Sequence, residues 1–200
     1  MNTIEAIEQR RAVKYYDPSH EMTKQEINQL ISLAQLAPTA FNQQNVRFVM
    51  VSDKELRKKI RVAAGGQAQV TDASLLIVLC ADTKAWEKEP MRYWANAPQE
   101  VQEYMQSAID QYYRTKEQVQ RDEGMRSAGI AAQTIMLAAK AMGLDTCPMD
   151  GFDFDAVGKL INLPDDHLIA MFVVVGKAAQ AAKPRPTQLA MSEVVVHDRF

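Results

Sequence analysis

The side chains best suited to holding a small anion lie near the two ends of the chain. Arg10, Arg11 and Lys14 form one cationic cluster, and Lys183 and Arg185 form the other. Arg offers a planar fork of donors and Lys a compact charge, and both suit a phosphate group. The net charge of the whole chain is −2, so the positive charge is local. These clusters indicate either an anion site, if folding brings them together, or two solvated basic segments.

Two further segments combine small residues with amide or free backbone groups. Residues 37–45 read APTAFNQQN, and residues 147–152 read CPMDGF. The amide groups of the first segment suit the edge of a heteroaromatic ring. Pro148 and Gly151 let the second segment pass close to a ligand with its N–H groups directed at it. Ordinary loops are the alternative interpretation of both segments.

The sequence lacks the motifs of the common catalytic machineries. It contains no GxGxxG after a strand, no GxxxxGK[ST], no GxSxG and no HExxH. His20, His167 and His197 are scattered, so a zinc or iron site has little support. Cys147 precedes a proline and has no evident histidine partner, which argues against a thiol nucleophile. By elimination, reaction chemistry belongs to a cofactor, and we assign no catalytic side chain.

Composition indicates an ordinary globular chain of one domain. Of its 200 residues, 47% are hydrophobic and 24% are charged. Cys80 and Cys147 lie in apolar runs, so we expect buried thiols in a reducing compartment. The N-terminus lacks the apolar core of a signal peptide, and residues 127–139 are too short to span a membrane. We therefore expect a soluble cytoplasmic protein with no membrane and no nucleic-acid partner.

Periodicity and capping signals predict a mixed fold of class α+β (α/β-like), with more helix than sheet. Capping boxes at 23–26 and 52–55 begin two helices, and the first helix must end before Pro38. A helix at 127–142 is apolar almost all round, which predicts a central helix or a subunit interface. Further expected elements are a helix at 99–122, strands at 46–51, 75–81 and 168–176, and an edge strand at 193–197.

Six segments, in this order and spacing, resemble the nitroreductase family of FMN-dependent oxidoreductases over essentially the whole chain. They are QRRAVKYYD, LAQLAPTAFNQQNVRFVMV, GGQAQVTDASLLIVL, AAQTIMLAAKAMGLDTCPMDGFD, LPDDHLIAMFVVVGKA and KPRPTQLAMSEVV. The resemblance implies one domain over residues 1–200, with a central sheet flanked by helices. It also implies an interlocked homodimer with two FMN sites at the subunit boundary. A variable lid-like insertion at about 83–125 is implied as well, with a solvated, aromatic-packed helix as the alternative.

The resemblance also implies, position by position, which residues contact FMN. These are Arg10, Lys183 and Arg185 at the phosphate; Arg11 and Ala12 along the ribityl chain; Lys14 near the pyrimidine edge; Pro38, Thr39, Ala40 and Asn42 from the partner subunit; Pro148, Met149, Asp150 and Gly151 along the ring, with the N–H groups of Asp150 and Gly151 meeting N5 and O4; and Gln67 and Gln69 at the ring edge.

Three positions depart from the family pattern. Ala12 stands where Ser is common, so one hydroxyl contact is missing. Gln69 stands where some members have Lys and donates without carrying a charge. Asn45-Val46 replaces the usual Pro-Trp, which affects packing and substrate shape. None of these departures removes the phosphate site.

The implied activity is a ping-pong hydride transfer through bound FMN. NADH or NADPH is the donor, and a small oxidised molecule is the acceptor. Nitro compounds, quinones, free flavins and enals all remain open as acceptors. Lys14 would favour the anionic reduced flavin electrostatically. The alternatives are a non-catalytic FMN-binding or regulatory module of the same fold, and a plain interaction domain.

Overall fold

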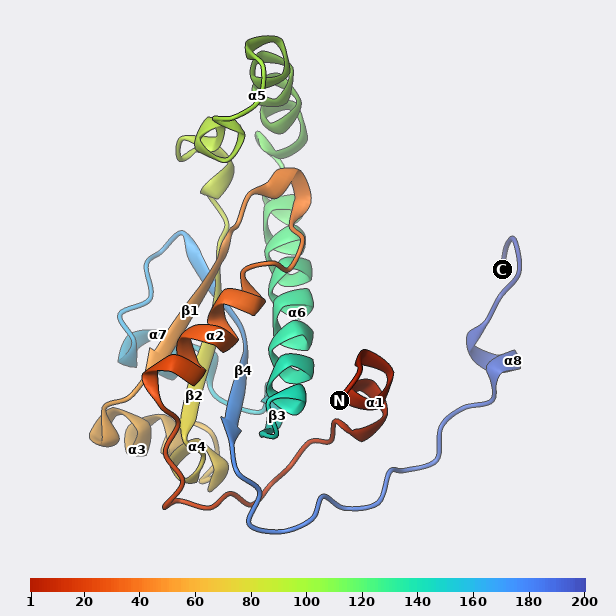
Figure 1. The fold of residues 1–200 in the computed structure, drawn as a ribbon. Helices are drawn as coiled ribbons and strands as arrows, with labels where there is room; N and C mark the ends of the chain where they lie inside the picture. The colour runs from red at the N-terminus through yellow and green to blue at the C-terminus, as the bar shows by residue number, and fades with distance from the viewer.

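The structure, a computed structural model, describes residues 1–200 as a four-stranded antiparallel sheet with helices on both faces (Figure 1). The strands, in the order β1-β2-β4-β3, are β1 (Val46–Val51), β2 (Leu75–Asp82), β3 (Asp145–Met149) and β4 (His167–Gly176). The helices are α1 (Thr3–Gln9), α2 (Lys24–Ala34), α3 (Lys54–Ala63), α4 (Gln69–Asp72), α5 (Gln99–Tyr113), α6 (Glu117–Ala141), α7 (Phe154–Leu160) and α8 (Met191–Val194). Short 3₁₀ turns are η1 (Ala40–Asn42), η2 (Ala85–Glu87) and η3 (Pro90–Trp94). The mixed class expected from the sequence is confirmed.

The two central strands supply both apolar cores, because their side chains alternate between the faces of the sheet. On one face, Leu76 and Val78 of β2 pack with α3, α4 and α7. On the other face, Leu75 and Ile77 pack with α2 and α6. Every residue of β2 is buried, which explains the uninterrupted apolar run in its sequence.

Side-chain caps set where the helices on both faces begin. The capping box at the start of α2 forms as expected: the Thr23 hydroxyl accepts from the N–H of Glu26, whose carboxylate accepts from the N–H of Thr23. The second expected box, starting at Ser52, is wrong. Asp53 is the N-cap of α3 instead, and its carboxylate accepts from the N–H of Leu56 at 2.6 Å. Asp and Ser are both strong caps, and here the carboxylate fits one residue later.

The expected helices at 99–122 and 127–142 have wrong boundaries. The chain breaks at Thr115, which has a φ of 62°, and α6 then runs without interruption from Glu117 to Ala141. The Gln120 side chain donates to the carbonyl of Tyr113 at 2.8 Å, and the same carbonyl, at the end of α5, also accepts from the N–H of Lys116 at 3.0 Å. Gln120 is buried against α5 although it is polar. The polar start of α6 can therefore be part of the central helix.

Helix α6 lies along the sheet as its central helix (Figure 1). Small residues such as Ala131, Ala132 and Ala139 are buried against β2 and β4. Ile130 lies on the opposite side of the helix and is 44% exposed. No helix of the structure is long and apolar enough to cross a membrane.

Strand β3 was not expected from the sequence. Its residues pair with β4, with Cys147 opposite Val174 and Pro148 opposite Val173. A proline is tolerated because β3 is the last strand of the sheet, where a missing N–H costs no ladder bond inside the sheet. Tertiary pairing, rather than local propensity, makes this segment a strand.

The last residues, 177–200, leave the sheet as an extended arm (Figure 1). The edge strand expected at 193–197 is wrong, because Met191–Val194 is a short helix and the residues after it pair with no strand. Leu189 and Met191 are 67% and 74% exposed. The β-branched residues 194–196, which predict a strand, pair with no strand of their own chain.

Candidate functional site

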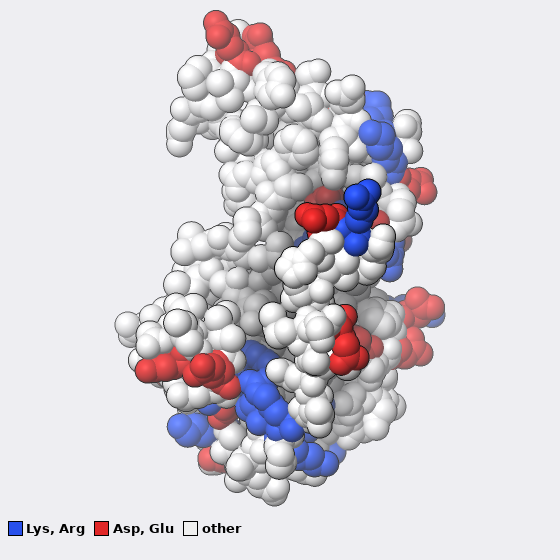
Figure 2. Space-filling model, turned by 90° about the vertical axis from the view of Figure 1, so that its right-hand side faces the viewer, with Lys and Arg blue, Asp and Glu red and all other residues white.

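The two cationic ends of the chain lie against each other. Arg185 Nη2 donates to the carbonyl of Glu8 at 2.8 Å and to that of Arg10 at 3.0 Å. Arg11 Nη2 donates to the carbonyl of Lys183. A cation is favourable at the end of α1, where backbone carbonyls lack helical partners. Figure 2 shows one group of Lys and Arg side chains in the lower half of the face that it draws, and further Lys and Arg side chains at the upper right. Residues up to 177 positions apart in the sequence thus lie in contact, and the two cationic clusters are adjacent in the fold.

The N-terminal segment then runs beside β3. Ala12 forms a parallel bridge with Thr146, and the N–H of Val13 donates to the carbonyl of Thr146 at 3.0 Å. This register places Lys14 Nζ 3.4 Å from Cys147 Sγ. Burial raises the pKa of the Cys147 thiol, and the positive charges of Lys14 and Arg10 only partly oppose that shift. The thiol is therefore protonated near neutral pH and accepts from Lys14.

A third group of predicted residues meets at the other end of β3. Gln67 Nε2 donates to the carbonyl of Gly151 at 3.0 Å. Gln69 Nε2 donates in turn to Gln67 Oε1 at 3.0 Å. The two amides come from the start of α4, and Gly151 follows β3. The amides of Gln67 and Gln69 and the backbone of Gly151 therefore lie together beyond the end of β3, the strand that carries Cys147.

The remaining predicted residues, Pro38 to Asn42, lie elsewhere in the single chain. They precede β1, which is the strand at the opposite edge of the sheet from β3. Val46 of β1 pairs with Ala81 near the end of β2, whereas β3 pairs with the final residues of β4, next to the start of β2. Figure 1 shows the two regions at different corners of the molecule. One chain does not bring all the predicted residues together.

The model of the Nitroreductase family matches residues 7–177. This chain belongs to the nitroreductase family. The matched region covers every element from α1 to β4, apart from the first residues of α1. The contact between the two ends of the chain described above is therefore a feature of a nitroreductase.

Curated and solved relatives of this nitroreductase match over nearly their whole length. Protein DrgA of Synechocystis is 52% identical over 182 residues, which cover 91% of this chain and 87% of that protein. MhqN of Bacillus subtilis, whose name includes NAD(P)H nitroreductase, is 32% identical and is covered to 95%. A nitroreductase from Exiguobacterium sibiricum, solved in complex with FMN, superposes with a TM-score of 0.89 at 26% identity; the match covers 98% of this chain and 97% of that one.

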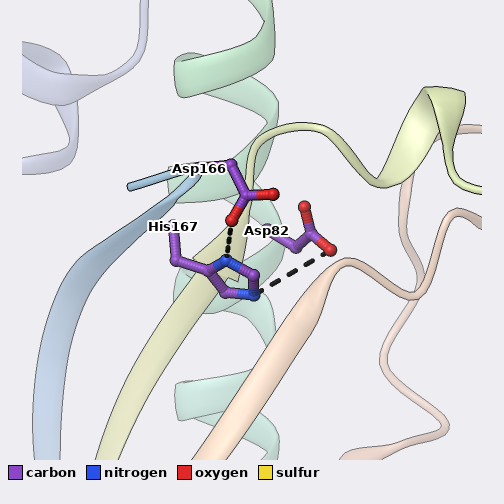
Figure 3. Close-up of side chains that lie close together, drawn as sticks. All are labelled: Asp82, Asp166 and His167. Carbon is purple, nitrogen blue, oxygen red and sulfur yellow. Dashed lines mark hydrogen bonds and ion pairs between the residues drawn. The ribbon is translucent and has the colours of Figure 1, made fainter. Parts of the chain in front are cut away.

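This nitroreductase also contains a charged cluster that the sequence analysis missed. Asp82 ends β2, and Asp166 and His167 lie at the start of β4 (Figure 3). His167 Nδ1 lies 2.6 Å from Asp166 and its Nε2 lies 3.9 Å from Asp82. Carboxylate and imidazole groups are metal-ligand types, but the ammonium of Lys88 already lies 2.9 Å from Asp82 and 2.5 Å from Asp166. We therefore assign the cluster as an ion-pair network.

The network joins the sheet to the segment that follows β2. The hydrogen bond from Lys88, and then that from His167, lowers the pKa of Asp166 to about 2. Lys88 belongs to residues 83–116, which lie between β2 and α6. No spacing in the sequence could reveal this cluster, because residues 82 and 166 meet only through the antiparallel pairing of β2 with β4.

Proposed function

We propose that this protein is an FMN-dependent oxidoreductase that uses NADH or NADPH to reduce small oxidised acceptors such as nitroaromatic compounds or quinones. The observation that carries the proposal is the contact of Arg185 with the backbone of Arg10. It creates, from the two ends of a slightly acidic chain, a local positive surface suited to a phosphate group. Family membership and the FMN complex of the Exiguobacterium relative support the choice of flavin.

The donor groups present suit the phosphate and the ring edge of FMN. Arg10, Arg11, Lys183 and Arg185 provide guanidinium and ammonium groups for the phosphate. Gln67, Gln69 and the backbone around Gly151 provide donors and acceptors suited to the polar edge of a flavin ring. Alternating amide and carbonyl groups are the partners that such an edge requires.

The side chains bind and orient rather than react covalently. When bound, FMN supplies the transfer of hydride between the nucleotide and the acceptor, in the ping-pong order that family resemblance implies. Lys14 would hold its positive charge near the pyrimidine edge of FMN, where it would stabilise negative charge. Cys147, protonated and buried, orients Lys14 and offers no nucleophilic thiolate.

A complete site requires a second subunit, so we propose a homodimer. The segment from Pro38 to Asn42 would reach the FMN of the partner, because within one chain it lies at the opposite edge of the sheet. Apolar side chains that need burial support the same proposal: Ile4 is 68% exposed and Ile7 is 51% exposed on α1.

The free edge of β1 offers a surface for the arm of the partner. β1 pairs with β2 alone, and a cavity of about 460 Å³ beside it is lined by Ile31, Phe48 and Met50 among others. An unpaired strand edge next to a partly apolar cavity favours the addition of a segment with apolar side chains. The arm at 187–200 carries such side chains, among them Leu189 and residues 194–196. We also propose the cytoplasm as the location, because both cysteines are free thiols.

The visible spectrum of the purified protein tests the cofactor. We expect a yellow protein with a flavin spectrum that bleaches on addition of NADH or NADPH without oxygen. Replacing Lys183 and Arg185 together by Ala should weaken FMN affinity by at least about tenfold, since hydrogen bonds to charged groups are worth roughly 1.5–3 kcal/mol each. Lys24 and Lys59, exposed cations on α2 and α3, give a matched double Ala control.

Undiminished FMN affinity in the Lys183/Arg185 variant would refute the phosphate assignment. A protein that binds FMN but oxidises no NADH or NADPH with any quinone or nitroaromatic acceptor would instead be the non-catalytic module. A colourless protein that takes up no FMN would leave only an interaction domain.

A further inference from the structure

The turn before β1 has a strained backbone. Phe41 and Asn42 each have a φ of 53°, and Gln44 has a φ of 45°. This left-handed region brings Cβ close to the following carbonyl, so it costs free energy for residues other than glycine, less for Asn than for Phe or Gln. A bulky aromatic residue such as Phe41 rarely adopts it. Three such residues within four positions persist only if the surrounding structure holds them.

Hydrogen bonds within the turn provide part of that support. The N–H of Gln44 donates to the hydroxyl of Thr39 at 3.0 Å, and the N–H of Asn42 donates to the carbonyl of Thr39, also at 3.0 Å. The Gln44 side chain donates to Asn42 Oδ1 at 3.4 Å. Gln43 is buried with no partner for its amide, so its side chain adds nothing to the support.

The rest of the support comes from residues 83–116. Trp94 Nε1 in η3 donates to the carbonyl of Phe41 at 3.2 Å. The Phe41 ring packs against Tyr112 and Tyr113 of α5, with centroid distances of 5.4 and 6.1 Å. The segment and the strained turn are therefore in contact through both the backbone and the ring of a single residue.

Residues 83–116 are themselves fixed in place. Trp86, Ile109 and Tyr113 form a small apolar core. Lys88 attaches the segment to the sheet through its bonds with Asp82 and Asp166. The segment can thus act on the turn as one unit. Figure 1 shows α5, which belongs to this segment, at the N-terminal end of α6.

We propose that Trp94 is a positioning residue: through the carbonyl of Phe41 it sets the shape of the turn at 41–44, and thereby the direction of the exposed Asn42 side chain. The part of this inference that concerns FMN rests on the proposed function, in which Asn42 contacts the flavin of the partner subunit. A ligand that displaces residues 83–116 in one subunit would then change the flavin contact made by that subunit.

The two tryptophans of the chain give a matched pair of variants. Trp94→Phe keeps an aromatic ring but removes the N–H that donates to Phe41. Trp86→Phe removes an indole N–H that is buried without a partner in the same segment. The measurement is amide hydrogen exchange over residues 39–45 in the full-length protein as purified.

We expect Trp94→Phe to speed exchange in this stretch by about threefold to tenfold, the size that one lost neutral hydrogen bond produces. Trp86→Phe trims the apolar core behind the segment but leaves the bond to the Phe41 carbonyl in place, so it should speed exchange less. Exchange in β2 and β4 reports whether either variant loosens the whole fold. If Trp94→Phe does so, Tyr112→Leu removes a different neighbour of Phe41 and should give the same local increase. Unchanged exchange at 39–45, or equal effects of both tryptophan variants, overturns the proposal.

FMN affinity tests whether the effect reaches Asn42. Trp94→Phe and Asn42→Ala should each weaken binding, and the double variant should be no weaker than the stronger single variant, because both act through one contact. Additive losses, or faster exchange with unchanged affinity, overturn the positioning role. If the protein takes up no FMN, the proposed function fails, while the exchange experiment still decides whether Trp94 holds the turn.

Discussion

At the scale of single residues, the surroundings of Lys14 leave its positive charge unpaired. Its ammonium group lies against the thiol of a buried cysteine, which the beta-bridge between Ala12 and Thr146 brings into range. Because burial keeps Cys147 protonated, the pair has a net positive charge, and Lys14 is not neutralised by a thiolate. That charge is available to a negatively charged part of a ligand.

Replacing Lys14 by Met should therefore lower the midpoint potential of the bound flavin. We expect a shift of some tens of millivolts, since about 30 mV corresponds to 1.4 kcal/mol for a two-electron couple. Spectroelectrochemical titration of the purified holoprotein measures it. Lys14→Arg keeps the charge and should shift the potential much less. An unchanged midpoint potential in the Lys14→Met variant would show that Lys14 does not act on the flavin.

At the scale of elements, α6 approaches the sheet so closely that a side chain at one of its positions would crowd β2. A Cβ built on Gly124 would lie 3.0 Å from the Cβ of Ala81, a buried residue of β2. A Cβ built on Gly129 of the same helix would meet nothing within 4 Å in the single chain. The two glycines therefore have different surroundings: Gly124 faces β2 closely, and Gly129 faces open space in the single chain.

Gly124→Ala should destabilise the protein by roughly 1–3 kcal/mol, the usual cost of overpacking a core. Gly129→Ala should instead stabilise it by about 0.5–1 kcal/mol, because Gly is unfavourable inside a helix. Denaturant unfolding at one fixed protein concentration measures both free energies. Equal effects of the two substitutions would mean that α6 does not pack on β2 as described, and a loss at Gly129 would reveal packing by a second subunit.

At the scale of the whole molecule, the arm is apolar where it is farthest from its own core. Val194, Val195 and Val196 are each at least 40% exposed, and so is Phe200. Such a segment gains free energy only by burial against another chain, at about 25 cal/mol for each Å² of apolar surface removed from water. The shape of the single chain therefore favours association through this arm.

If the proposed dimer forms through the arm, deleting residues 187–200 should yield a monomer. Size-exclusion chromatography with light scattering measures the mass of each form. Val62→Asp, at a position of α3 that is 79% exposed, changes another exposed apolar residue and should leave the mass unchanged. A truncated chain with the mass of the intact protein would exclude the arm from the interface.

Much of the fold was predictable because its strongest elements are determined locally. The apolar runs of β1, β2 and β4 were expected within a residue of their observed bounds, and the capping box at Thr23 begins α2 as expected. β3 was missed because its strand character comes from pairing with β4. The break at Thr115 was missed because the contact of Gln120 with Tyr113 that stabilises it involves two helices.

The resemblance of six segments indicated the family without coordinates. Residue types and their order predicted the cationic ends and the buried central strands, because these depend on composition and local periodicity. Only the tertiary structure decided which of those residues meet. Arg185 contacts Arg10, and Lys88 contacts Asp166, through chain reversals of many residues that leave no local signature. Antiparallel pairing across a sheet joins positions by register, and register is set by burial of whole faces rather than by any single residue.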